Sequence, residues 1–252
     1  MFSYLRDPGA DGVGVAFTSA EEDLSDAAPP AARAAAFGRL AVALGVPVAV
    51  VRQVHGDRVL DVDAVPAAPS GGLLDLTAVE ADALVTGVRG LGLAVRVADC
   101  VPVLFADAAA GLVGAAHAGR AGLLRGVLAA TVAVLRARGA SRLTAWVGPH
   151  ICAACYEVPA DMAADFAAAT GVAAAVTRWG TPGIDLGAAA RRQLAALGVP
   201  HASHEACTFH DAGLHSHRRD AACAGRLAGV VWLSGSVPTR PGAPRAATGG
   251  GG

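Results

Sequence analysis

The chain has 252 residues, enough for a substantial hydrophobic core, and a formal net charge of −1. This charge balance gives no electrostatic reason to expect a nucleic-acid or anionic-membrane partner. All 20 basic residues are arginines, so the lack of lysine excludes Schiff-base chemistry, a lysine nucleophile and a phosphate-loop lysine.

The hydropathy pattern and the number of cysteines indicate where in the cell the protein is located. The first residues lack the charged and apolar regions of a signal peptide, and no apolar run of about 18 residues is free of charges and turn residues. The five cysteines are an odd number, which argues against a disulfide framework. We therefore expect a cytoplasmic protein with reduced thiols.

The predicted elements mix strands and helices without a regular βαβ rhythm. Apolar, β-branched runs predict strands at 13–18 (as an edge strand), 46–62 with a break at 55–57, 80–86, 91–97, 142–147, 204–208 and 227–233. Apolar residues at helical spacing, with Pro and Gly boundaries, predict helices at 31–44, 123–138, 159–170 and 184–197. We expect an α+β fold with mixed sheets, one domain over 1–237 and a disordered tail over 238–252.

The segment 98–122 carries the first candidate site. Two apolar runs flank a polar turn at 107–111, which predicts two buried strands. Cys100 stands at the start of this pair and His117 at its end, so pairing of the strands brings a thiol and an imidazole to one edge of a sheet. A thiolate at neutral pH requires a nearby cation, base or metal, and an imidazole supplies or shares that role.

His55 is a third candidate, in the sequence V-H-G after an apolar run. Two histidines and one cysteine form a three-ligand set with an open fourth position, as in catalytic zinc sites. No local metal motif joins His55 to Cys100, however. From the residues alone, a strand-end histidine and a buried cysteine explain the pattern equally well.

Several short blocks together resemble a known family. In chain order they are Q-V-H-G-D-R-V, A-D-A-L-V-T, A-D-C-V-P-V-L-F-A-D, A-A-H-A-G, G-P-H-I with C-Y-E-V, D-L with Q-L, C-T, and S-H-R-R with G-R. The chain resembles, from about residue 13 to residue 233, the YfiH family, also called the laccase-domain, multicopper polyphenol oxidase or purine nucleoside phosphorylase family. The run A-D-C-V-P-V-L followed by H-A-G is the most specific part.

The resemblance implies a single domain of packed mixed β-sheets flanked by helices. It also implies one zinc ion per chain, held by His55, Cys100 and His117. Members of the family are credited with phosphorolysis of adenosine, inosine and methylthioadenosine, and with adenosine deamination. We therefore expect a purine nucleoside as substrate and phosphate as co-substrate. Zinc lowers the pKa of a bound water to about 7, which suits attack on C6 of adenine.

Arginines are the expected phosphate ligands, because the guanidinium fork matches two phosphate oxygens. Those in the family's motifs are Arg52, Arg120, Arg218 and Arg219, although an exposed surface charge is the usual role of a long arginine. The family usually has H-A-G-W-R-G where this chain has H-A-G-R-A-G, so the tryptophan is missing and an arginine stands one position earlier. Arg120 or Arg125 would then replace the family's usual arginine. Glu157 is a candidate general acid or base, and a strand-end salt bridge explains it equally well.

Other cysteines, histidines and acids have less specific patterns. Cys152 and Cys155 form C-A-A-C, but no second pair follows at zinc-site spacing, so we expect ordinary packing roles for both. His215 and His217 form an H-x-H pair, yet the histidines outside the proposed ligands are too scattered for a multicopper polyphenol oxidase. Asp99 is expected to orient a neighbouring ligand or cap a turn.

Two further classes of function remain compatible with the sequence. One is a metal-free thiol hydrolase, with Cys100 as nucleophile and His117 as base. Its substrate would be an amide such as a peptidoglycan precursor, since family members have been linked to cell-wall editing. The other is a non-catalytic domain that keeps zinc for stability. The sequence leaves the oligomeric state open.

Overall fold

A computed structural model of the chain describes residues 1–65, 69–204 and 206–235. The predicted tail at 238–252 and the end of the predicted domain at 236–237 lie outside these residues. Within them, two six-stranded mixed sheets pack face to face and carry helices on their outer faces. The α+β architecture of packed mixed sheets that the sequence and its family resemblance predict is thereby confirmed.

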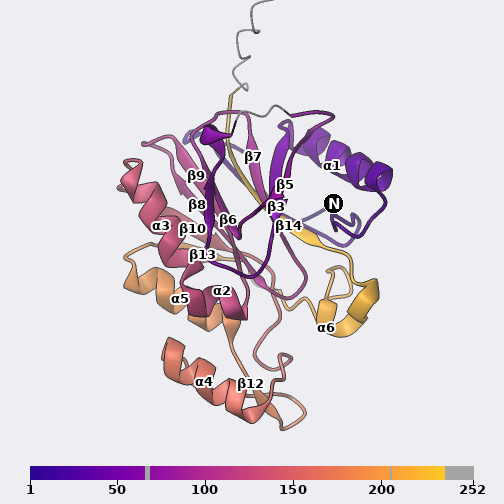
Figure 1. The fold of residues 1–252 in the computed structure, drawn as a ribbon, viewed down its shortest axis with the longest axis vertical. Helices are drawn as coiled ribbons and strands as arrows, with labels where there is room; N and C mark the ends of the chain where they lie inside the picture. The colour runs from indigo at the N-terminus through magenta and orange to yellow at the C-terminus, as the bar shows by residue number, and fades with distance from the viewer. Residues whose placement is uncertain (66–68, 205, 236–252) are drawn as a thin grey trace, which may run out of the picture.

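The first sheet combines strands from both ends of the chain (Figure 1). In spatial order its strands are β1 (Phe2–Arg6), β2 (Val13–Thr18), β14 (Leu227–Leu233), β7 (Gly92–Val97), β3 (Val48–Arg52) and β5 (Leu73–Glu80). The strand β3 runs parallel to both of its neighbours, whereas β14 is antiparallel to β2 and β7.

The second sheet is centred on a hairpin. In spatial order its strands are β13 (His201–Ser203), β10 (Thr144–Val147), β8 (Val101–Asp107), β9 (Leu112–Ala118), β6 (Ala83–Thr86) and β4 (Val59–Asp61). A separate two-stranded ribbon joins β11 (Ala175–Val176) to β12 (Pro182–Gly183).

Helices cover the outer faces of both sheets. They are α1 (Pro30–Leu44) on the first sheet, and α2 (Arg120–Arg125), α3 (Val127–Ala137) and α5 (Leu186–Ala196) on the second. Helix α4 (Ala160–Thr170) belongs to the same core cluster but lies below the sheets, against α2 and β12 (Figure 1). The short α6 (His217–Asp220) and two 3₁₀ turns (Val62–Ala64 and Ala221–Cys223) complete the elements of the described residues. No helix in this part of the chain is long and apolar enough to cross a bilayer.

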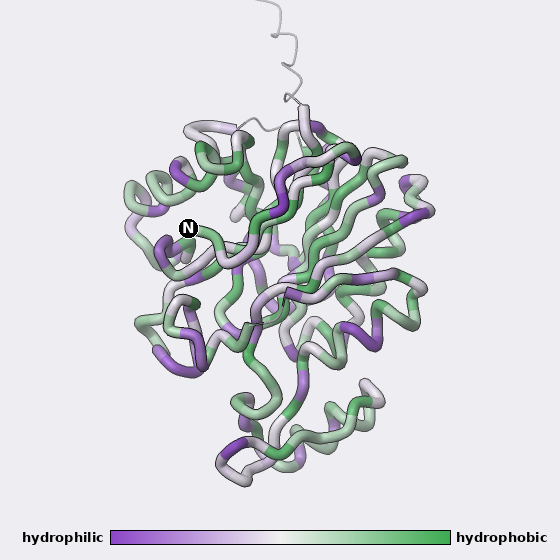
Figure 2. The backbone as a smooth tube through the Cα atoms, turned by 180° about the vertical axis from the view of Figure 1, so that it is seen from behind, coloured by the Kyte–Doolittle hydropathy of each residue, from purple (hydrophilic) through white to green (hydrophobic). Residues whose placement is uncertain are grey.

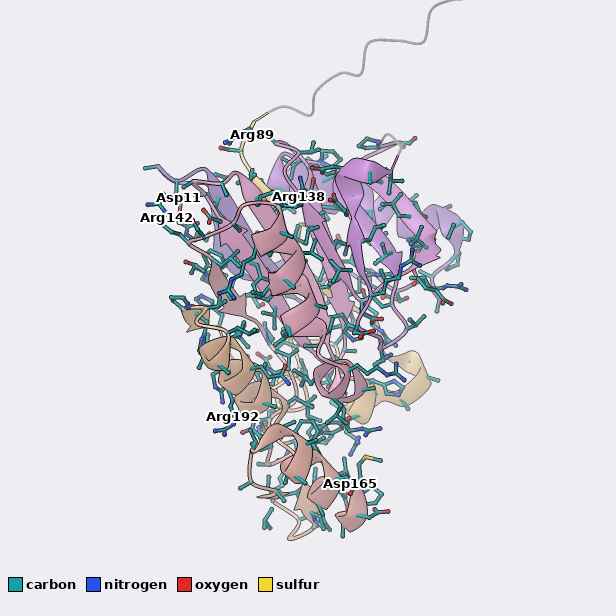
Figure 3. The ribbon with its side chains drawn as sticks, turned by 60° about the vertical axis from the view of Figure 1, so that its left-hand side comes forward. Asp11, Arg89, Arg138, Arg142, Asp165 and Arg192 are labelled. Atoms are coloured by element: carbon teal, nitrogen blue, oxygen red, sulfur yellow. The ribbon has the colours of Figure 1, made fainter. Side chains whose placement is uncertain are left out.

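Successive side chains of a strand point to opposite faces of the sheet, so each strand contributes to two packed layers. On β3, Val48 and Val50 pack under α1, whereas Ala49 and Val51 face the layer between the two sheets. Apolar residues run along the central strands in Figure 2, and the charged residues labelled in Figure 3 lie at the periphery. Strands buried on both faces therefore read as continuous apolar runs in the sequence.

Several predicted elements differ in the structure. The strand at 13–18 is not an edge strand, because β1, which the pattern did not predict, pairs outside it. The predicted helix at 123–138 is two helices, because Gly126 has φ of 88° and ends α2. The strand predicted at 204–208 is shifted to β13 at 201–203, and β5 was not predicted.

Candidate functional site

The hairpin of β8 and β9 brings two predicted ligands together. His117 lies opposite Pro102 in the antiparallel register, so Cys100, two residues before Pro102, lies at the same edge of the sheet. The imidazole of His117 is buried and Cys100 is half-buried. This is the convergence that the two apolar runs of the sequence predict.

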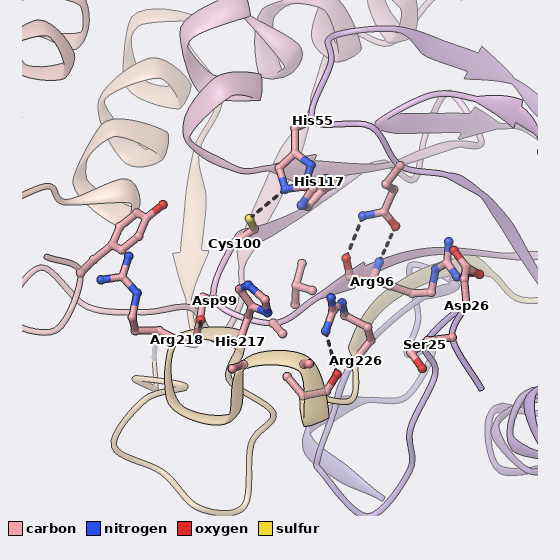
Figure 4. A pocket seen from close by; sticks show the side chains of 18 residues that line it. Ser25, Asp26, His55, Arg96, Asp99, Cys100, His117, His217, Arg218 and Arg226 are labelled. Carbon is pink, nitrogen blue, oxygen red and sulfur yellow. Dashed lines mark hydrogen bonds and ion pairs between the residues drawn. The ribbon is translucent and has the colours of Figure 1, made fainter. Parts of the chain in front are cut away.

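His55 approaches the same point from the first sheet. It follows the end of β3 and has φ of 60°, an uncommon conformation for a residue other than glycine. Its Nε2 lies 3.8 Å from the Sγ of Cys100, and its ring centroid lies 4.7 Å from that of His117. One nitrogen or sulfur atom from each of these three residues, which we term the cavity triad, lies within 4.8 Å of the others (Figure 4).

Asp82 positions two members of the triad through a single carboxylate. It is fully buried, and its Oδ1 lies 2.8 Å from Nδ1 of His117. The same carboxylate accepts hydrogen bonds from the backbone N–H groups of Val54, His55 and Gly56. Asp82 belongs to the block A-D-A-L-V-T, but its role was missed because a lone strand-end acid gives no sign of its partners.

Electrostatics favour an ionised thiol in the metal-free site. Burial alone raises the pKa of Cys100, but the adjacent His117 and His55 outweigh it and lower this pKa to about 6. Burial would lower the pKa of His117, yet the Cys100 thiolate and Asp82 raise it to about 9. Both shifts favour the charged pair, a Cys100 thiolate beside a His117 imidazolium.

Gly119 leaves the room that the triad requires. A Cβ atom at this position would lie 2.8 Å from the Sγ of Cys100 and 3.0 Å from a ring carbon of His55. The glycine of H-A-G is thus explained by a close approach of side chains to the backbone.

The donor set of the triad fits a zinc ion. Zinc binds thiolate and imidazole, and three protein ligands with an open position are typical of catalytic sites. The contact from Asp82 to Nδ1 of His117 leaves Nε2 free to bind a metal. A carboxylate on the other ring nitrogen is a usual outer partner of a metal-ligating histidine.

A cavity of about 590 Å³ opens directly beside the triad. This volume is in the range of small-molecule sites. The polar side chains that complete its wall are those of Ser25, Asp26, Gln53, Arg96, Asp99, Tyr156, His217, Arg218 and Arg226. Of the four arginines that the sequence nominated, Arg218 alone lines this cavity.

Arg96 and Arg226 are wall residues that sequence reasoning missed. Arg96 is 5% exposed, forms an ion pair with Asp26 and donates to the carbonyl of Val51. Arg226 is held by the carbonyls of Ala224 and Gly225. Arg96 lies inside an apolar strand and Arg226 precedes another, so only the chain's path in space identifies them.

Arg218 and Arg120 are close to Tyr156. The guanidinium of Arg218 lies 5.0 Å from the centroid of the Tyr156 ring and donates to the carbonyl of Glu157. Burial raises the pKa of Tyr156, and the Cys100 thiolate raises it further, while Arg218 and Arg120 act in the opposite direction. Arg120, the first residue of α2, thus acts on the cavity electrostatically without lining it.

The other nominated residues lie outside the cavity. Arg52 pairs with Glu80 at 2.8 Å, and both side chains are more than half exposed. The guanidinium of Arg219 donates to backbone carbonyls of 208–214 and to Asp220, so it organises that loop. The side chain of Glu157 is exposed.

Asp99 caps a turn, as one of its two expected roles. With φ of 88° it is not in a regular strand, and its buried carboxylate accepts from the hydroxyls of Thr208 and Ser216. It also accepts from the backbone N–H of Arg218 at 2.6 Å, which fixes the start of α6 beside the cavity.

Residues 5–234 match the model of a family described as multi-copper polyphenol oxidoreductase laccase. The chain belongs to this family. One solved relative is a Neisseria meningitidis protein that is 30% identical to this chain, with a TM-score of 0.76. The match covers 93% of this chain and 99% of that protein. YlmD from Geobacillus stearothermophilus has 28% identity, a TM-score of 0.78, and 91% and 94% coverage.

Curated members of the family carry a different functional name. A Streptomyces griseus protein named purine nucleoside phosphorylase is 50% identical over 211 residues, which cover 81% of this chain and 82% of that protein. A Mycobacterium tuberculosis protein of the same name is 47% identical over 210 residues, covering 81% and 80%. The family prediction made from the sequence blocks is therefore confirmed.

Proposed function

We propose that the chain is a zinc-dependent purine nucleoside phosphorylase acting on adenosine, inosine and methylthioadenosine. The observation that carries this proposal is the cavity of about 590 Å³, which has the triad at one side and three arginines in its wall. The name of the relatives at 44–50% identity supports the same reaction.

Phosphorolysis requires a bound phosphate, and the arginines of the cavity wall are its expected ligands. A phosphate oxygen bonds to the anomeric carbon of the ribose while the bond from that carbon to the purine nitrogen breaks. The electron pair leaves with the base, which takes up a proton, and the other product is the ribose 1-phosphate. Arg218 and Arg226 would bind phosphate through charge-assisted hydrogen bonds, with Arg96 as a fixed positive charge in the wall.

Tyr156 and the triad complete the site. The Tyr156 hydroxyl is protonated at neutral pH, as that of an ordinary tyrosine is, and burial raises its pKa further, so it can donate a hydrogen bond to the purine. His55, Cys100 and His117 would hold the zinc ion, which supplies Lewis-acid charge stabilisation when bound. Asp82 keeps His117 in the ligating orientation.

The deciding experiment is an inosine assay with and without phosphate. We expect hypoxanthine and ribose 1-phosphate in equal amounts when phosphate is present, and no turnover without it. Zinc removal should abolish the reaction and zinc return should restore it. Inosine left intact in the presence of phosphate and zinc would contradict the proposal.

Adenosine deamination is the second activity we propose for the same cavity, since an open zinc site suits attack on C6 of adenine. The product would be inosine plus ammonia, formed without phosphate. Adenosine that disappears only with phosphate, giving adenine, would leave phosphorolysis as the sole activity.

The thiolate–imidazolium pair favours one alternative, a metal-free thiol hydrolase that attacks an amide through Cys100. Such an enzyme keeps its activity in a chelator and loses it on alkylation. An activity that zinc removal abolishes would contradict it. Both proposals require a reduced Cys100, which is consistent with the cytoplasmic location expected from the cysteine count.

The word copper in the family's description fits this chain poorly. Imidazole-rich sets suit copper(II). Among the described residues, the cavity triad is the one potential ligand group that contains more than one histidine. We therefore propose no oxidase chemistry.

A further inference from the structure

A second group of metal-ligating side chains lies outside the cavity. It consists of Cys152, Cys155, Cys207 and His210, which we term the loop tetrad. One sulfur or ring nitrogen atom from each residue lies within 4.8 Å of the corresponding atoms of the others. None of the four lines the cavity. The sequence predicts packing roles for Cys152 and Cys155 because no second pair follows at zinc-site spacing, but the structure brings C-T-F-H at 207–210 beside them.

Two turns of the same kind present the four ligands. The N–H of Cys155 bonds to the carbonyl of Cys152 at 2.9 Å, and the N–H of His210 bonds to the carbonyl of Cys207 at 3.0 Å. Each turn thus places residues three apart on one side, the spacing at which cysteine and histidine pairs bind zinc. A parallel bridge between His150 and Cys207 holds the two turns together.

A backbone N–H group points at the sulfur of Cys207. The N–H of Cys152 donates to this Sγ at 3.4 Å. A sulfur that accepts an N–H bond is suited to the thiolate form, which is the form that binds metal.

The distances suit a small tetrahedral ion. With zinc–sulfur bonds of about 2.3 Å, tetrahedral geometry places two sulfur ligands about 3.8 Å apart. The Sγ of Cys155 and the Nε2 of His210 are 3.0 Å apart, and the largest separation in the set is below 4.8 Å. Shifts of less than about 1 Å would therefore give the zinc geometry.

Charge balance gives an independent argument. Zinc with three thiolates and a neutral imidazole has a net charge of about −1. Arg178 donates to the Sγ of Cys155 at 3.0 Å, and its guanidinium lies 5.0 and 5.2 Å from the ring centroids of Trp179 and Phe209, which contact each other edge to face. A fixed cation thus lies where a thiolate-rich site would need one.

We propose that the loop tetrad is a second zinc site, structural rather than catalytic, so that the chain binds two zinc ions. Four protein ligands close the coordination sphere, which is typical of structural zinc. The site would tie the segment that supplies Tyr156 to the cavity wall to a second segment that contacts Asp99 in that wall. Tyr156 directly follows Cys155, and Thr208, which donates to Asp99, directly follows Cys207.

Metal analysis of the purified protein tests this directly. We expect two zinc ions per chain, one in Cys100→Ser and one in Cys207→Ser. Cys223→Ser is the matched control, since Cys223 is exposed and belongs to neither group, and it should keep two. A wild-type protein with a single zinc that Cys100→Ser removes would overturn the proposal, and so would copper bound to the tetrad. A single zinc that only Cys207→Ser removes would support this site while contradicting the zinc-dependent phosphorylase.

Cobalt(II) spectroscopy keeps the proposal testable if Cys207→Ser fails to fold. Zinc-stripped Cys100→Ser protein refilled with cobalt should show the strong visible bands of a tetrahedral ion and intense thiolate charge-transfer absorption. His210→Cys should keep both features, whereas His210→Ala should weaken them. Weak bands typical of octahedral cobalt in the refilled Cys100→Ser protein would overturn the assignment.

A disulfide is the competing use of the same cysteines. Alkylation of the denatured, unreduced protein followed by mass spectrometry counts free thiols. We expect all five cysteines to be modified after chelation. A linked pair within Cys152, Cys155 and Cys207 in freshly purified protein would overturn the zinc assignment.

Discussion

The cavity triad and the loop tetrad use the same ligand chemistry on different supports. The triad is built on strand ends, and buried Asp82 holds two of its three segments. The tetrad is built on two turns joined by an isolated bridge and by the bond from the Cys152 N–H to the Sγ of Cys207, and His210 is exposed. Three ligands beside a cavity leave a position for a substrate, whereas four ligands away from it leave none. If both proposals hold, ligand number and support, rather than residue type, separate the reactive site from the structural one.

The largest expected effect separates the two sites by function. Cys100→Ser should reduce phosphorolysis by more than about 100-fold, because loss of a ligand exceeds the cost of losing an outer partner. Cys207→Ser should leave turnover at 25 °C within a few-fold of wild type and instead lower the melting temperature by several degrees. Steady-state kinetics and calorimetry on both variants measure this. Equal losses of activity in the two variants would erase the distinction.

The next effect tests the support of the triad. Asp82→Asn should weaken zinc binding at the triad by roughly 10- to 100-fold, the usual cost of removing an outer partner. Competition with a chromophoric chelator measures the affinity of each site, and the tetrad should be unchanged. Asp63→Asn is the matched control, since Asp63 also accepts a backbone N–H and pairs with Arg138, away from both groups. Equal affinities in the Asp82→Asn and wild-type proteins would show that strand ends alone hold the triad.

A smaller effect concerns substrate binding beside the triad. Arg218→Ala should raise the KM for phosphate by about tenfold, since hydrogen bonds to charged groups contribute about 1.5 kcal/mol or more. The KM for inosine should change less. Arg142→Ala, at the exposed surface labelled in Figure 3, is the control. A phosphate KM that is the same in both variants would remove Arg218 from the phosphate site.

The smallest effect is a shift along the pH axis. In zinc-free protein the pKa of Cys100 is lowered to about 6, so its thiolate fraction rises as the pH increases through 6. Iodoacetamide should therefore modify Cys100 with a half-maximal rate near pH 6, whereas cysteines of the urea-unfolded chain should follow a pKa of about 8.5. Peptide mass spectrometry resolves the sites, and zinc should protect Cys100. A half-maximal rate near 8.5 in folded protein would show that His117 and His55 do not stabilise the thiolate.

Two features of the triad were readable from the sequence. The apolar runs on either side of the turn at 107–111 predict a hairpin, and the hairpin brings Cys100 and His117 to one edge. The V-H-G block placed His55 after a strand, although only the family resemblance joined it to the other two. Gly126 shows the limit of periodicity, since its positive φ breaks a helix whose apolar spacing continues across it.

The sequence by itself determined most of the strands and helices, the family and the candidate ligands of the proposed zinc site in the cavity, because alternation and local turns depend on neighbours along the chain. Only the tertiary structure decided that Arg96 and Arg226 share a cavity with Arg218, and that Arg52 and Arg219 do not. It also joined C-A-A-C to C-T-F-H across 55 residues between Cys152 and Cys207. Such pairings depend on how strands from distant segments are ordered in the sheets, and side-chain pattern alone does not encode that order.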